Sequence, residues 1–133
     1  MKPTPIVITM VMCDHVLQDV RTNKKSLIGL FNQFNVGKFP SKIRTFSVFV
    51  KLTEGRGAPN CELRCINAET NDLIAQLTGP INFKNPNDIL DFTFQIDGLS
   101  FPAPGDYRFE FLSEGKLLSS NRFKVIQNNR GAQ

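Results

Sequence analysis

Several residue types that usually carry catalysis or recognition are scarce or missing in this chain of 133 residues. It has no tryptophan, one tyrosine (Tyr107) and one histidine (His15), against twelve phenylalanines. Phenylalanine supplies large apolar area without needing a hydrogen-bond partner, so these aromatic residues are expected to serve packing rather than recognition. A single histidine excludes most general-base schemes. The sequence also lacks a nucleophile elbow, a P-loop and a dinucleotide-binding motif, which favours a binding module over an enzyme.

Charge of one sign is not concentrated anywhere in the chain. Sixteen lysines and arginines against twelve aspartates and glutamates give a formal net charge of +4, with no block of five like charges. Nucleic-acid-binding domains usually gather basic residues on one face, often beside exposed aromatic residues. Nucleic-acid binding is therefore disfavoured, and a small-ligand or nucleic-acid binder that uses basic loops is kept as the alternative function.

Long hydrophobic runs are absent as well. No apolar stretch reaches the 18 or so residues of a membrane-spanning helix, so no membrane association is expected. The apolar run at residues 6–13 follows Pro3 and Pro5 and lacks a small-residue cleavage site, which is unlike a signal peptide. We therefore expect a cytoplasmic protein with one domain over residues 1–133, including a frayed tail from about residue 127.

The three cysteines are Cys13, Cys61 and Cys65, and an odd count argues against a full disulfide framework. Cys61 and Cys65 lie four residues apart on a predicted strand, which separates their α-carbons by roughly 13 Å, too far for a bond. A disulfide bond from Cys13 to Cys61 or to Cys65 remains an alternative. Free buried thiols in a reducing compartment are the preferred interpretation.

Apolar and polar residues alternate along four segments, at 45–54, 61–66, 89–96 and 106–112. A helix would scatter such residues around its surface, whereas a half-buried strand lines them up on one face. The residues predicted to face inward are Phe46, Val48, Val50, Leu52, Cys61, Leu63, Cys65, Leu90, Phe92, Phe94, Ile96, Tyr107, Phe109 and Phe111. Turn residues follow at 67–72, where Asn71 suits the left-handed conformation, and at Glu114–Gly115.

The other segments are less regular. Residues 6–13 are apolar on both faces, which predicts a central strand covered on both sides, and 14–22 have room for one helical turn. Residues 24–36 predict a further strand, in which Gly29 marks a bulge or a close backbone approach. Residues 73–83 and 116–126 are the remaining predicted strands. Together these segments predict an all-β fold, a mainly antiparallel sandwich of seven to nine strands.

The segment Gly105-Asp106-Tyr107-Arg108-Phe109 resembles the start of the F strand in immunoglobulin-like and fibronectin-like sandwiches. In those domains a tyrosine two positions before a core residue bonds through its hydroxyl to backbone upstream. Phe109 stands where antibody domains carry their second cysteine, and their strand-C tryptophan has no counterpart here. The alternative is that Tyr107 packs with its hydroxyl at the solvent boundary.

Three longer segments, at 13–40, 46–52 and 101–118, resemble a family of small bacterial β-sandwich domains of unknown function. The shared features are a first strand that ends near an Asp, a Ser-Leu-Ile-Gly-Leu-Phe strand, a Phe-Pro connection and a closing hairpin after Pro-Gly-Asp-Tyr. The resemblance implies a cytosolic β-sandwich, and it carries over no catalytic or binding residue.

The sequence Cys13-Asp14-His15 is the one cluster of candidate metal ligands or of a thiol nucleophile with its base. Its spacing matches no established zinc motif, and neighbouring strand residues point to opposite faces. Burial of Cys13 in an apolar strand would also raise its pKa and lower its reactivity. No catalytic residue, metal or cofactor is therefore predicted, with Cys13 and His15 as weak candidates for a metal.

The connections are the better candidates for a functional surface, because rigid sandwiches commonly present loops to partners. Residues 37–44 combine Phe39 with cations, and 53–60 are rich in glycine. The predicted partner-binding residues are Lys38, Phe39, Lys42, Arg44 and Arg56. The predicted function is protein interaction, through these loops or through strand addition at an exposed sheet edge. In one alternative, this strand addition joins two copies of the chain into a homodimer.

Overall fold

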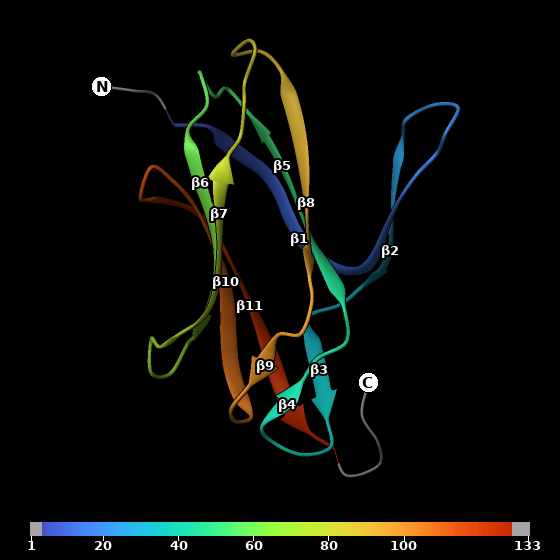
Figure 1. Ribbon diagram of the computed structural model, residues 1–133, viewed down its shortest axis with the longest axis vertical. Helices are drawn as coiled ribbons and strands as arrows, with labels where there is room; N and C mark the ends of the chain where they lie inside the picture. The colour runs from blue at the N-terminus through green and yellow to red at the C-terminus, as the bar shows by residue number, and fades with distance from the viewer. Residues whose placement is uncertain (1–3, 129–133) are drawn as a thin grey trace.

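A computed structural model describes residues 4–128, and within this range the chain forms eleven strands and no helix (Figure 1). Residues 4–128 accordingly contain no helix that is long and apolar enough to cross a membrane. The strands are β1 (Ile6–Gln18), β2 (Lys25–Leu30), β3 (Gln33–Val36), β4 (Ser41–Lys42), β5 (Phe46–Thr53), β6 (Asn60–Asn67), β7 (Leu73–Pro80), β8 (Ile89–Ile96), β9 (Ser100–Phe101), β10 (Gly105–Ser113) and β11 (Lys116–Gln127).

Two sheets face each other across the core. The first has the strand order β2-β1-β5-β8 and the second the order β3-β11-β10-β6-β7, while β4 and β9 form a short pair. The pairs are antiparallel except for β3, which runs parallel to β11. The predicted all-β sandwich is confirmed. Its strands outnumber the predicted seven to nine because β4 and β9 lie within predicted connections and because residues 24–36 form two strands.

The core lies between the central strands of the two sheets. Phe46, Val48, Val50 and Leu52 of β5 are completely buried, as their alternation predicts. On the facing sheet, Cys61, Leu63 and Cys65 of β6 and Phe109 and Phe111 of β10 are buried in the same cluster. Glu62 and Arg64 point outward and form an ion pair, with Arg64 Nε 2.6 Å from Glu62 Oε2. For these three strands the alternation predicts both the strand and its buried face.

Tyr107 closes the corner between β9 and β10. Its ring is fully buried beside Phe101, with centroids 4.7 Å apart, and its hydroxyl donates a 2.6 Å hydrogen bond to the carbonyl oxygen of Ala103. Desolvation raises the pKa of this hydroxyl above its ordinary value. The predicted tyrosine corner of an immunoglobulin-like sandwich is confirmed, and a hydroxyl at the solvent boundary is wrong.

The predicted turns adopt the expected backbone. Asn71 has φ 62° in the β6–β7 turn, and Glu114 and Gly115 have φ 49° and 80° in the β10–β11 turn. Two successive residues with positive φ match the twist of a two-residue hairpin. Local sequence therefore sets the connections that define the register of the second sheet.

The N-terminal third differs from the sequence prediction. β1 continues to Gln18, so residues 14–18 extend the strand, and a turn with an Asn23 N–H to Asp19 carbonyl hydrogen bond follows at 19–23. Ile6 and Ile8 are half-exposed rather than covered on both faces. Residues 24–36 split at Phe31 and Asn32 into β2 of the first sheet and β3 of the second. The physical reason is that β1 has a second edge, opposite β5, which pairs with β2 from Cys13–Leu30 to Gln18–Lys25 and so draws residues 25–30 into the first sheet.

Residues 14–30, here called the arm, are the part of the β1–β2 hairpin that stands to one side of the sandwich (Figure 1). Gly29 has φ 73°, and a Cβ there would overlap the Asp14 carboxylate, so the close approach at this glycine is made by a side chain rather than by backbone. Asp14 Oδ1 lies 2.9 Å from Arg44 Nη2, and the Arg44 guanidinium lies 5.2 Å from the centroid of the Phe31 ring. These contacts fix the base of the arm to the sandwich.

Candidate functional site: the open flank between β7 and β8

One side of the sandwich is not closed by strand pairing. β7 is the last strand of the five-stranded sheet and β8 the last of the four-stranded sheet, and within residues 4–128 neither has a second neighbour. The two strands lie side by side at the front of Figure 1 with a space between them. Each therefore presents one edge of unpaired backbone N–H and C=O groups. We call this side the open flank.

Apolar side chains of both strands point into the open flank. On β8, Phe92 and Phe94 lie opposite Val50 and Val48 in the β5–β8 register, and this places them on the core face. On β7, Leu77 and Ala75 likewise lie opposite Leu63 and Cys65 of β6, although no paired strand covers their outer side. The predicted burial of Phe92 is wrong, since this side chain is 38% exposed, and Phe94 is only half-buried.

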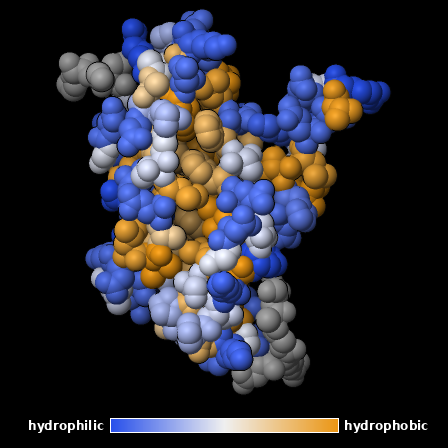
Figure 2. Space-filling model, in the orientation of Figure 1, coloured by the Kyte–Doolittle hydropathy of each residue, from blue (hydrophilic) through white to orange (hydrophobic). Residues whose placement is uncertain are grey.

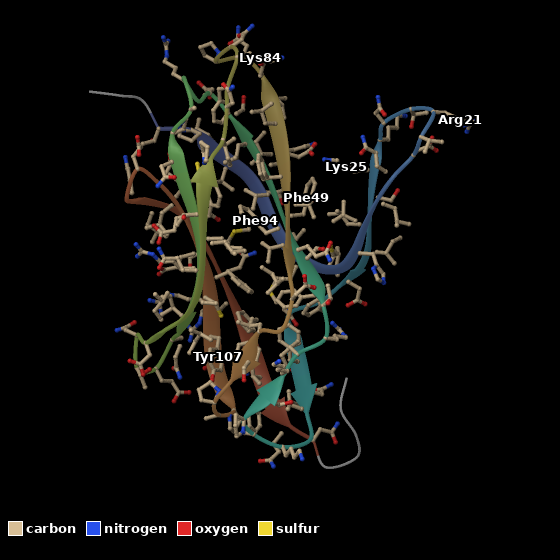
Figure 3. All side chains as sticks on the ribbon, in the orientation of Figure 1. Arg21, Lys25, Phe49, Lys84, Phe94 and Tyr107 are labelled. Atoms are coloured by element: carbon tan, nitrogen blue, oxygen red, sulfur yellow. The ribbon has the colours of Figure 1, made fainter. Side chains whose placement is uncertain are left out.

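A cavity of about 340 Å³ opens at this position. Its apolar lining includes Leu63, Cys65, Ile74, Leu77 and Phe109, and its polar lining includes Gln76, Gln95 and Asp97. Figure 2 looks onto this side, where hydrophobic residues line a hollow between two columns of hydrophilic surface. Figure 3 places Phe94 between β7 and β8, above the buried Tyr107. The open flank thus combines an apolar floor with two unpaired backbone edges.

The β7 edge has little of the usual protection against association. Exposed edge strands are normally blunted by charged residues, particularly lysine, or by proline. Residues 73–80 contain no charged residue, the proline Pro80 stands at the very end of the strand, and Leu77 is 44% exposed. Residues 73–79 of the β7 edge are therefore suited to pairing with another strand.

Acidic residues outnumber basic ones in the segment that contains β7 and β8. Residues 72–97 contain four aspartates and one lysine, a formal charge of −3 against +4 for the whole chain. Asp97 at the rim of the cavity accepts a 2.7 Å hydrogen bond from the Thr45 hydroxyl. Asp91 lies opposite Lys51, on the face of β8 turned away from the core, and pairs with Lys25 of the arm. Of the residues that line the cavity only Asp97 is charged, so a segment bound beside it should carry positive charge.

The cysteines and the histidine do not form a reactive site. Burial raises the pKa values of Cys13, Cys61 and Cys65, with that of Cys65 reaching about 12, so the thiolate is scarce at neutral pH. All three are free thiols. Cys13 is completely buried while His15, two residues along β1, is exposed. Across 4–128 no three His, Cys, Asp or Glu side chains are grouped closely enough to hold a metal.

The five predicted partner-binding residues fall into separate places. Lys38, Phe39 and Lys42 lie around β4, with Phe39 packed against the core, and the β5–β6 connection that carries Arg56 lies at the opposite end of the molecule (Figure 1). Arg44 is half-buried in its pair with Asp14. The structure does not bring these residues together on one surface, and their role in binding stays a prediction.

The residues that line the open flank, such as Leu77 and Phe92, were not predicted as functional. One signal was available, namely the absence of charge from residues 73–80. It could not be used without knowing that β7 lies at an edge, because an uncharged strand is equally typical of a sheet interior.

Comparison with known protein families shows the family to which the chain belongs. The model of a family of unknown function, DUF6941, matches residues 8–126. The chain belongs to this family. The sequence resemblance to a family of unknown function is thereby confirmed, and membership in DUF6941 assigns no activity. No curated protein matches the chain.

Solved structures resemble this DUF6941 chain at low identity. The alkylpurine DNA glycosylase AlkC of Pseudomonas fluorescens, bound to DNA with an abasic site analog, aligns over 87% of this chain at 10% identity with a TM-score of 0.50. This chain spans 30% of the length of that enzyme, so the likeness concerns the fold alone.

Two further structures align less closely. An immunoglobulin-like protein of Pseudomonas aeruginosa has 13% identity and a TM-score of 0.41, with 94% of this chain and 98% of that protein covered. A β-glucosidase of Kluyveromyces marxianus has 12% identity and a TM-score of 0.46, with 73% of this chain and 15% of the enzyme covered.

Proposed function

We propose that the chain is a protein-binding module that accepts an extended segment of a partner at the open flank. The observation that carries the proposal is that two unpaired strand edges flank an apolar cavity. In strand addition, main-chain hydrogen bonds supply affinity, and pockets for alternate side chains supply specificity. The open flank offers both, with Leu77 of β7 on one wall of the cavity and Gln95 and Ile96 of β8 on the other.

The lining of the open flank defines the chemistry of the partner segment. Alternate side chains of an added strand would reach the cavity, and they should be apolar, since the floor consists of Leu63, Ile74 and Phe109. The side chains between them would meet the rim, where Asp97 is the charged residue of the cavity lining. The favoured segment therefore alternates apolar residues with lysine or arginine.

The arrangement of the cations supports a protein partner over a nucleic acid. β4, which contains Lys42, lies at one end of the sandwich, and the β5–β6 connection that carries Arg56 lies at the other (Figure 1), whereas a nucleic-acid-binding surface gathers its cations on one face. The cavity is also within the size range of small-molecule pockets. Its strand edges favour an extended chain over a compact ligand.

Labelled peptides test the proposal directly. A peptide of about eight residues, alternating leucine and lysine, should raise its fluorescence anisotropy on titration with the protein. A peptide that alternates leucine and glutamate should bind at least about tenfold more weakly, a difference of roughly 1.4 kcal/mol. Because the attraction involves exposed charges, the difference between the two peptides should shrink at high salt.

A pair of variants locates the binding. Leu77→Asp places a carboxylate in the open flank and should abolish binding of the leucine–lysine peptide. Leu117→Asp changes a side chain of similar exposure on β11, outside the residues that line the cavity, and should leave binding unchanged. Equal binding by both variants, or no binding by the unaltered protein, would refute the proposal.

A further inference from the structure

The arm carries a second apolar surface that the sandwich does not cover. Leu30 is 63% exposed, Leu17 and Ile28 are about half-exposed, and Val20 at the tip is 94% exposed. In the β1–β2 register, Leu30 lies opposite Cys13, Ile28 opposite His15 and Leu17 opposite Ser26. Since alternate residues of a strand share a face, Leu17, Ile28 and Leu30 form one apolar face of the arm.

This apolar face points away from the chain's own open flank. Lys25 lies opposite Gln18 in the register, on the other face of the arm, and it pairs with Asp91 on β8. Figure 3 shows Lys25 directed from the arm toward β8, with Phe49 between β8 and the arm. The face that contains Lys25 therefore turns inward, so Leu17, Ile28 and Leu30 lie on the outward face, where a second molecule can reach them.

The arm carries a net positive charge. Residues 14–30 contain Arg21, Lys24 and Lys25 against Asp14 and Asp19, a formal charge of +1, while residues 72–97 carry −3. Lys25 pairs with Asp91 of the same chain, so Arg21 and Lys24 are the cations offered to a partner. β2 is in addition the terminal strand of its sheet, so its outer backbone edge is unpaired within residues 4–128. An isolated two-stranded hairpin is marginally stable in water, so a covering partner would stabilise the arm.

We infer that the open flank of one copy receives the arm of a second copy. The inference rests on the proposed function, and it identifies the partner segment as residues 14–30 of the same protein. Leu17, Ile28 and Leu30 pack against the apolar floor, and Arg21 and Lys24 lie near the acidic rim. If the exchange is reciprocal about a two-fold axis it closes as a dimer, whereas a one-way exchange would extend into chains.

Complementation between two variants tests this inference. Ile28→Asp spoils the arm and leaves the open flank intact, while Leu77→Asp spoils the flank and leaves the arm intact. In sedimentation experiments the unaltered protein should form a dimer that weakens with added salt. Each variant alone should remain monomeric, and Leu117→Asp should dimerise normally.

An equimolar mixture of Ile28→Asp and Leu77→Asp should form a heterodimer held by the one intact arm–flank contact. Its affinity should be at least about tenfold higher than the self-affinity of either variant. A contact between two flanks or between two arms could not be restored by mixing, so a mixture that stays monomeric would overturn the inference. Circular dichroism of each variant must match that of the unaltered protein, and Leu17→Asp replaces Ile28→Asp if the latter fails to fold.

The outcome separates the inference from the function on which it rests. A strictly monomeric protein that still binds the leucine–lysine peptide at the open flank would overturn the arm exchange and leave the proposed function standing. A monomer that binds no such peptide would overturn both. A dimer that persists in Leu77→Asp would also reject the exchange, because its contact would lie elsewhere.

Discussion

Two strands of this protein each contain two phenylalanines separated by one residue, and the two pairs differ in how deeply they are buried. β10 contains Phe109 and Phe111, and β8 contains Phe92 and Phe94, each pair on the core face of its sheet. Phe111 is completely buried, while Phe92 is 38% exposed. β10 lies between β6 and β11, whereas β8 pairs with β5 alone among the strands of residues 4–128. The difference comes from the position of the strand in its sheet.

The comparison separates two properties that alternation is often taken to report together. A period of two identifies which face of a strand an apolar residue occupies. The extent of burial depends on how far the opposite sheet reaches, and the five-stranded sheet does not cover β8 completely. Phe94 retains one contact across the gap, with its ring centroid 6.3 Å from that of Phe111. An apolar face at an edge is thus available for binding.

Truncation of the two pairs should give the largest difference. Phe111→Ala should lower the free energy of unfolding by about 3–5 kcal/mol, because it leaves a cavity in the core. Phe92→Ala should cost about 1 kcal/mol, since much of its side chain already contacts water. Urea unfolding measures both values. Equal losses would contradict the distinction between the central and the edge strand.

Alkaline pH tests the burial around β10 without changing its sequence. Cys65 lies opposite Phe109 in the register, and desolvation raises its pKa from 9.0 to about 12. Between these values the unfolded chain loses the proton first, so stability should fall as pH rises, by about 1.4 kcal/mol per unit for this thiol. Urea unfolding from pH 8 to about 11 follows the loss.

A variant isolates the contribution of this thiol. Cys13, Cys61 and Tyr107 have raised pKa values as well and act in the same direction. Cys65→Val removes one ionising group and should make the alkaline fall in stability shallower. A stability that does not change with pH over this range would show that water reaches these central positions.

The corner that precedes β10 should give a smaller effect. Tyr107→Phe keeps the ring between Phe101 and Phe123 and removes the 2.6 Å hydrogen bond to the Ala103 carbonyl. The expected loss is about 1–2 kcal/mol, the cost of one buried hydrogen bond and its unsatisfied acceptor. Thermal unfolding should show a lower midpoint with unchanged secondary structure. No change would mean that the hydroxyl contributes nothing to the corner.

The smallest effect is expected at the edge of the second sheet. Leu63 and Leu77 lie opposite each other on β6 and β7, and Leu63 is buried while Leu77 is exposed. Leu77→Thr keeps a residue suited to strands and should change stability by only about 0.5 kcal/mol, whereas Leu63→Ala should cost about 2–5 kcal/mol. Urea unfolding of both variants, with a loss for Leu77→Thr as large as that for Leu63→Ala, would show that the flank is closed in solution.

The sequence predicts the central strands well and the N-terminal third poorly. β5, β6 and β10 have strict alternation bounded by turn residues, and the conformations of Asn71 and Glu114–Gly115 follow from local chemistry. By contrast, the crossing between the sheets at Phe31 and Asn32 depends on which strands have free edges. Such a choice is made by tertiary pairing, and no local pattern encodes it.

The sequence predicts the type of candidate site but not its location. Strand addition at an exposed edge was anticipated, and the strand that provides the edge was not. The loop cations predicted to bind a partner are dispersed in space, and Arg44 is engaged with Asp14 and Phe31. Whether Leu77 and Phe92 are covered depends on the relative widths of two sheets, which is a property of the assembled fold.

The buried Tyr107 gives this protein an unusual spectroscopic simplicity. It is the one tyrosine of a chain without tryptophan, so the intrinsic emission reports a single corner of the fold. A ligand that carries tryptophan would be excited selectively against a dark background. The transfer of its indole from water into the flank could then be followed as a blue shift, with no dye attached to either molecule.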